Sequence, residues 1–113
     1  MKKEKLQVNT DYFENIVACQ ALTNSYYASL VLEHLSPENF KNPGNKLIVG
    51  IIKDFFTKRR SLPTITEIKT YLSKDEELKL FKDTVTAFKQ IELNGNIEEL
   101  IANTETFFKE RAV

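Results

Sequence analysis

The apolar residues of this chain recur at spacings of three and four, and this spacing restricts its fold more than any other feature. Amphipathic helices bury one face with such a spacing, whereas strands alternate apolar and polar residues. Only three glycines and three prolines interrupt the pattern along 113 residues. The sequence therefore predicts an all-α chain that folds as a compact bundle of about six helices.

Helix starts are marked by two kinds of local signal. Four pairs fit the capping-box pattern, in which a polar cap precedes glutamate by three residues: Asp11 with Glu14, Thr64 with Glu67, Ser73 with Glu76, and Asn96 with Glu99. Two further pairs place a capping side chain before proline: Ser36 with Pro37, and Asn42 with Pro43. Together they predict helices over about 12–23, 25–35, 43–58, 65–72, 75–92 and 96–113, and the fifth ends at Asn94 and Gly95.

Two of these helices carry apolar faces of different width. The helix over 43–58 is predicted to be the central and most buried one, because its apolar surface is the broadest. That surface consists of Leu47, Ile48, Ile51, Ile52, Phe55 and Phe56. The helix over 25–35 carries a narrower core stripe of Tyr27, Leu30, Val31 and Leu35.

Composition bounds the class of protein. The 16 basic and 16 acidic residues cancel, so no overall field draws the chain to nucleic acid or a membrane. No apolar run is long enough for a signal peptide or a membrane span. The single Cys19 excludes an internal disulfide, and Cys19 with the lone His34 cannot form a zinc framework. We expect one intracellular domain over residues 1–113.

No catalytic constellation is found in the sequence. Gly44, Gly50 and Gly95 stand apart, so a glycine-rich phosphate loop is missing. His34 has no acid or nucleophile at a recognisable spacing and is interpreted as a surface residue. Cys19 is interpreted as a small buried hydrophobe. We therefore predict no catalytic residue, no metal site and no cofactor site in this segment.

The last helix carries more apolar surface than one neighbour can cover. One stripe contains Ile97, Ile101 and Phe108, and a second contains Leu100 and Phe107. Two stripes require two partners, so these five residues are the candidates for a protein interface. The helix also reaches Val113 without a stop signal, which predicts a fragment of a longer protein.

The densest basic segment is a candidate for weak contact with nucleic acid. Lys58, Arg59 and Arg60 follow Phe55 and Phe56, and single strands are bound by charge combined with aromatic stacking. The two phenylalanines have core spacing, however. Contact with DNA by this domain is therefore expected to be weak or absent.

Several segments, taken in order, resemble the N-terminal domain of DnaB-type replicative helicases. The run 14–22 resembles the start of that domain, and the run 35–40 (LSPENF) resembles its short turn before a central helix. Further matching positions are Pro43, Lys46, Leu47, Ile48 and Ile52, then 62–65, 96–98 and 109–112. Departures from the family pattern are Asn45 in place of a histidine, Pro63 in place of an aspartate, and Val49 and Gly50 in place of bulkier residues.

The resemblance implies a helical head over about 11–92 and a last helix over 96–113 that begins a helical hairpin. In this family such hairpins pair between subunits and build the collar of a hexameric ring, which also docks primase or a helicase loader. ATP and magnesium belong to the family's C-terminal motor domain, which this segment lacks. The implied location is the cytoplasm of a bacterial cell or of a phage-infected host, and the departures suit a divergent, phage or bacterial member.

Two other classes of function stay open at this point. The chain can be a stand-alone helical adaptor or inhibitor that acts on replication proteins. It can also be a small domain that binds single-stranded nucleic acid through Lys53, Lys58, Arg59 and Arg60. Because half of the implied hairpin is missing, the isolated domain is expected to be monomeric or weakly dimeric.

Overall fold

A computed structural model describes residues 10–91 and 96–111, and all regular structure within these ranges is helical. Six α-helices and two short 3₁₀ turns are present, which confirms the predicted fold class. In chain order they are α1 (Thr10–Thr23), α2 (Ser25–Val31), η2 (Leu32–His34), η3 (Pro37–Asn39), α3 (Pro43–Arg59), α4 (Ile65–Thr70), α5 (Asp75–Phe88) and α6 (Ile97–Arg111).

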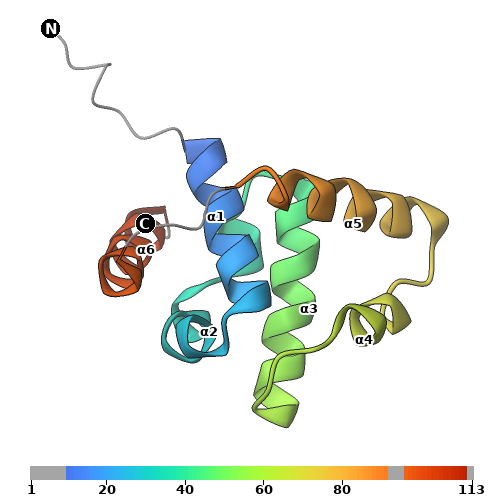
Figure 1. The fold of residues 1–113 in the computed structure, drawn as a ribbon, viewed down its shortest axis with the longest axis horizontal. Helices are drawn as coiled ribbons and strands as arrows, with labels where there is room; N and C mark the ends of the chain where they lie inside the picture. The colour runs from blue at the N-terminus through green and yellow to red at the C-terminus, as the bar shows by residue number, and fades with distance from the viewer. Residues whose placement is uncertain (1–9, 92–95, 112–113) are drawn as a thin grey trace, which may run out of the picture.

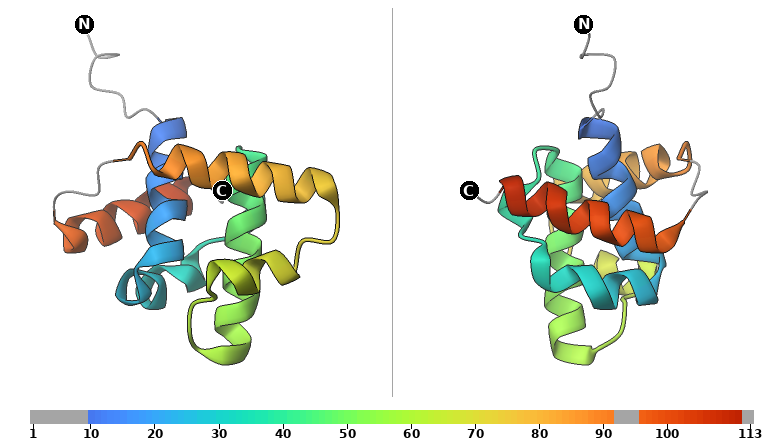
Figure 2. Two further views of the ribbon diagram at one scale, coloured as in Figure 1. Left: turned by 45° about the vertical axis from the view of Figure 1, so that its right-hand side comes forward. Right: turned by 90° about the vertical axis from the view of Figure 1, so that its left-hand side faces the viewer.

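The helices are arranged around a central pair, α1 and α3, which lie side by side (Figure 1). Helix α5 crosses one end of this pair, and α4 lies with α5 on the side of α3 that faces away from α6. Helices α2 and α6 cover the opposite side, with α6 lying across α1 beside α2 (Figure 2). The last helix is thus packed onto the head.

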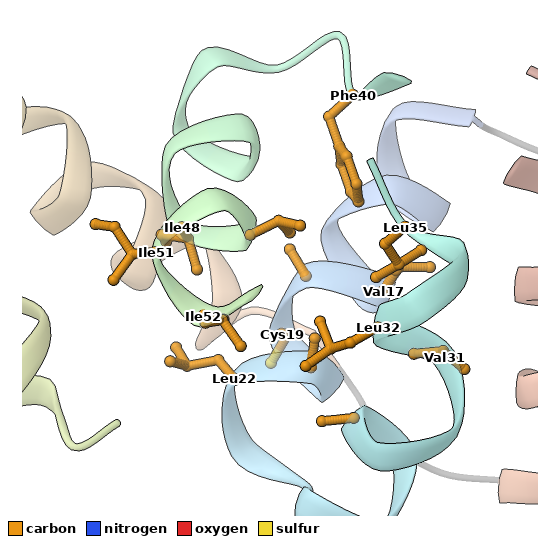
Figure 3. Packing of buried hydrophobic residues seen from close by; sticks show 14 of the residues in the cluster. Val17, Cys19, Leu22, Val31, Leu32, Leu35, Phe40, Ile48, Ile51 and Ile52 are labelled. Atoms are coloured by element: carbon orange, nitrogen blue, oxygen red, sulfur yellow. The ribbon is translucent and has the colours of Figure 1, made fainter. Parts of the chain in front are cut away.

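The core lies where α1, α2 and α3 meet (Figure 3). Ile48 and Ile52 of α3 are fully buried there and face α1. Helix α3 is central, as predicted, and α1 shares this position, since all six residues of α1 from Val17 to Leu22 are also buried. Ala18, Cys19 and Ala21 are small enough to let neighbouring helices approach α1 from several sides.

Several of the predicted start signals are confirmed. Asn42 Oδ1 accepts hydrogen bonds from the Gly44 and Asn45 amides at 2.8 and 3.2 Å, so it caps α3 before Pro43. Thr64 and Glu67 form the complete capping box of α4. Asn96 Oδ1 likewise accepts from the second and third residues that follow it, at 2.8 and 3.2 Å.

Two predicted capping boxes are wrong. Helix α1 already includes Asp11, so Asp11 does not precede the helix as a cap would, and the Glu14 carboxylate is buried and accepts the Lys41 and Asn42 amides. Helix α5 begins at Asp75 after Lys74, so Ser73 lies too early to cap it. The predicted stop at Asn94 and Gly95 falls outside the described residues.

Two predicted helices are shorter than the apolar pattern suggests. The second ends at Val31 and tightens into η2, which buries Leu32 and leaves Leu30 40% exposed, so the core assignment of Leu30 was wrong. The fifth ends at Phe88 instead of about residue 92. Its final amides at Gln90 and Ile91 form bonds of the i→i−3 type, which tighten the chain into a turn.

Gly44 permits the closest approach between α3 and α5. A Cβ atom at this position would lie 1.8 Å from Thr84 Oγ1 and 3.0 Å from Thr84 Cβ. Thr84 is buried on α5, and its hydroxyl donates to the Leu80 carbonyl at 2.7 Å. The crossing of these two helices therefore requires glycine at position 44.

We expect Gly44→Ala to lower the free energy of unfolding by about 1–3 kcal/mol, because the added methyl forces α3 and α5 apart. Denaturant unfolding measures this loss. Gly50→Ala is the matched control, since its Cβ would meet only Pro37 at an ordinary 3.7 Å and alanine favours the helix. Equal stability changes in the two variants would contradict the close crossing.

Candidate protein-binding surface

Helix α6 is fastened to α2 through a buried pair of hydroxyl groups. Tyr27 Oη and Thr104 Oγ1 lie 2.6 Å apart, and both residues are fully buried. Thr104 donates its hydroxyl proton to the Leu100 carbonyl at 2.7 Å, so Tyr27 is the donor in the pair. Burial raises the pKa of Tyr27 well above its usual range, which keeps this donor protonated.

Two exposed contacts extend the same seam in both directions. Tyr26 Oη donates to Glu98 Oε2 at 2.7 Å near the start of α6, and this bond raises the pKa of Tyr26. At the other end, His34 Nε2 lies 3.8 Å from Glu105 Oε2. In these contacts, residues with higher numbers in the first segment pair with residues with higher numbers in α6. Helices α2 and α6 therefore run in the same direction, as Figure 2 shows.

Two aromatic contacts anchor the C-terminal half of α6. Phe108, only 1% exposed, packs against Phe40 with ring centroids 4.6 Å apart. Phe107 meets Phe13 of α1 edge to face at 4.9 Å. Neighbouring residues diverge around a helix, so these two rings attach α6 to two different parts of the head.

The five predicted interface residues are therefore used within the chain itself. Ile101 and Phe108 are buried, and the other three are partly buried against the same core: Ile97, Leu100 and Phe107. Within the described part of the chain, Phe107 packs against Phe13 of α1, Phe108 packs against Phe40 in the loop before α3, and α6 contacts α2. Contact of these residues with a second protein stays a prediction. The outer face of α6 is polar.

One part of this region stays open to solvent. A pocket of about 290 Å³ lies over the Phe13–Phe107 pair at the C-terminal end of α6. Asn103, Thr106 and Glu110 form its polar rim. An aromatic floor with a polar rim is typical of the centre of a protein interface. This pocket is the candidate protein-binding surface.

The carboxylate of Glu14, which follows Phe13 in the chain, is buried. Glu14 is 1% exposed, and its two oxygens accept the Lys41 and Asn42 amides at 3.0 Å each. The amide nitrogen of Asn45 contacts Glu14 Oε1 at 3.5 Å and donates to Asn15 Oδ1 at 2.7 Å. The negative charge lies at the start of α3, where the helix dipole stabilises it.

Each residue of the basic segment has a local structural role. Lys58 pairs with Asp54 one turn earlier at 3.1 Å, and the Arg59 guanidinium lies 5.3 Å above the Phe55 ring. The Arg60 amide bonds to the Phe56 carbonyl and ends α3. The C-terminal end of a helix disfavours anions, so these contacts give no support to a nucleic-acid surface at this end.

The two residues considered for catalysis lie apart. Cys19 is buried in the core, and burial raises the pKa of its thiol, which disfavours the reactive thiolate. His34 is half-exposed beside a pocket of about 390 Å³ together with Glu105 and Lys109. Within residues 10–91 and 96–111, no group of three or more histidine, cysteine or acidic side chains could hold a metal ion, and no helix is long and apolar enough to cross a bilayer.

Sequence reasoning missed three residues of this region. Glu14 was read as a helix cap, although a glutamate inside an apolar run is itself a signal of a buried polar contact. Phe13 is partly buried, and its position depends on how α6 crosses α1. Thr104 has no local signal, because its partner Tyr27 lies 77 residues earlier in the chain.

Comparisons with protein-family models, with curated proteins and with solved structures found no match for this chain.

Replacement of Glu14 by glutamine should lower the free energy of unfolding by about 1–3 kcal/mol. The amide nitrogen of glutamine would face one of the two backbone N–H donors, which then lacks an acceptor in a buried site. Thermal unfolding measures the loss. Glu67→Gln is the control, because Glu67 also accepts from a backbone amide but in a solvent-exposed hydrogen bond, and glutamine suits a capping box. A Glu14→Gln variant as stable as this control would show that the carboxylate is dispensable.

Tyr27→Phe should lower the free energy of unfolding by about 1 kcal/mol, because Thr104 Oγ1 loses its donor while the ring stays in place. Denaturant unfolding gives the value. Tyr71→Phe on the exposed surface serves as the control and should change little. Matching values for both variants would mean that the buried hydroxyl pair does not hold α6.

Proposed function

We propose that this chain is a protein-binding module without catalysis of its own, the N-terminal collar domain of a DnaB-type replicative helicase. The binding role rests on the pocket over Phe13 and Phe107. Both rings are partly buried, so they are held in place by the head while one surface stays open. Rigid aromatic residues of this kind supply much of the binding energy at protein interfaces.

The helicase assignment rests on the resemblance of the sequence, and residues in and beside the resembling segments contact one another. Glu14 of the first segment binds the amides of Lys41 and Asn42, directly after the second segment. Phe40 of the second segment packs against Phe108 of the last helix.

The packing of α6 decides where a partner would bind. Ile101 and Phe108 cannot contact another protein while they are buried in the head. We therefore assign the contact with other subunits, primase or helicase loader to the pocket rimmed by Asn103, Thr106 and Glu110. In this proposal the protein acts in the cytoplasm, and ATP and magnesium act in a separate motor domain of the parent helicase.

Asn103→Arg should abolish binding by placing a long charged side chain over the aromatic floor of the pocket. Sedimentation velocity would follow self-association, and titration with the purified primase and helicase loader of the same genome would give affinities. We expect a roughly tenfold or greater loss of affinity. Ala102→Arg is the matched control, since this neighbouring residue is exposed and does not line the pocket.

Two results would contradict the proposal in different ways. If the chain neither self-associates nor binds primase or loader, the collar function is wrong. If binding occurs but Asn103→Arg and Ala102→Arg weaken it equally, the pocket is not the contact surface. The natural reading frame gives a separate test, because the helicase assignment requires a phosphate-binding loop downstream of this segment.

A further inference from the structure

A smaller pocket lies between two parts of the chain. One part is α2 with η2, and the other is the last two turns of α3. Its volume is about 110 Å³, room for one small oxyanion. The floor is apolar and consists of Leu32, which is buried, and Phe56, which is partly buried. Two cationic side chains, Lys53 and Arg60, line the same pocket.

Lys53 is held in place by a contact with another element. Its half-buried ammonium group donates to the carbonyl of Leu35, just after η2. An ammonium group has three protons, and this bond uses one of them. Among the described residues, no carboxylate lies within ion-pair distance of Lys53. The structure therefore holds a cation at the pocket without neutralising its charge.

Arg60 is the only non-glycine residue in the described ranges with a positive φ, which is 57°. Glycine is strongly preferred at this position after a helix, because a Cβ atom is strained in the left-handed region. Arginine at this position places a positive charge at the C-terminal end of α3, where the helix dipole favours it. Like Lys53, it has no ion-pair partner in the described part of the chain.

We propose that this pocket binds a single oxyanion, a phosphate or carboxylate group, between the Lys53 ammonium and the Arg60 guanidinium. The remaining polar groups limit the site to one small anion. The Ser29 and Thr57 hydroxyls donate to backbone carbonyls, so binding rests on the two cations. Glu33 also lines the pocket, and its negative charge, together with the negative end of the α3 dipole, opposes an extended polyanion such as a nucleic-acid strand. The two cations must offset both effects to hold one small anion.

The test is a titration of the full chain with sodium phosphate, followed by amide NMR shifts at constant ionic strength. We expect saturable shifts near Lys53 and Arg60, with a dissociation constant on the order of 1 mM. Parallel titrations with sodium acetate and with oligothymidylate identify the source. Tighter binding of phosphate or of acetate shows which oxyanion the pocket prefers, and either result supports the site.

Arg60→Gly separates binding from folding. Glycine relieves the left-handed strain, so the melting temperature should stay equal or rise, while phosphate binding weakens roughly tenfold. Arg59→Gln removes the same charge from the adjacent residue, which does not line the pocket, and should leave binding unchanged. Glu33→Gln should strengthen binding because it removes the competing negative charge.

Three outcomes would overturn this inference. Shifts that follow ionic strength instead of saturating would show that no discrete site exists. Equal weakening by Arg60→Gly and Arg59→Gln would show a diffuse basic surface. Oligothymidylate that binds more tightly than phosphate, and loses affinity in Arg59→Gln, would point to a polyanion surface instead.

Discussion

The carboxylate of Glu14 is the contact on which the arrangement of the other elements depends. It belongs to the central helix α1, and it accepts the amides of Lys41 and Asn42 directly before α3 begins. This bond fixes the start of α3 relative to α1 and also the position of the preceding residue, Phe40. Phe40 in turn forms the surface on which Phe108 packs. One buried charge thus connects the central helix pair to the place where α6 docks.

A buried charge is stable only where it is fully hydrogen-bonded. Glu14 meets this requirement with backbone amides, which are donors whatever side chains surround them. The neighbouring Asn45 is less well satisfied, since its Oδ1 atom is buried and has no hydrogen-bond partner among the described residues. Its amide nitrogen must face Asn15 and the carboxylate, which turns the oxygen away from every donor. Asn45, whose oxygen is left unpaired, is one of the positions where the sequence departs from the family pattern that it resembles.

The sequence predicts helix starts, which depend on residues close together in the chain. It does not predict contacts between residues that are far apart in the chain. Helices α3 and α4 begin where Asn42 and Thr64 predict, because a cap needs only residues two or three positions away. Glu14, by contrast, accepts amides 27 and 28 residues further along the chain, which no local pattern predicts. The apolar residues of α6 were recognised correctly, but periodicity cannot say whether the partner that covers them lies in the same chain or in another.

The way α6 is held bears on what a partner can contact. Detaching α6 would expose Phe108 and Ile101 and would leave the Tyr27 hydroxyl without Thr104, so the docked state is favoured by apolar and polar terms together. The outer face of α6 is therefore the part of this helix that stays exposed. That face carries exposed acidic residues along its whole length: Glu98, Glu99, Glu105 and Glu110. Although the whole chain is neutral, these four carboxylates outnumber the one exposed basic side chain described on this helix, Lys109. The partner that we propose would therefore present a basic surface around an apolar residue that enters the Phe13–Phe107 pocket.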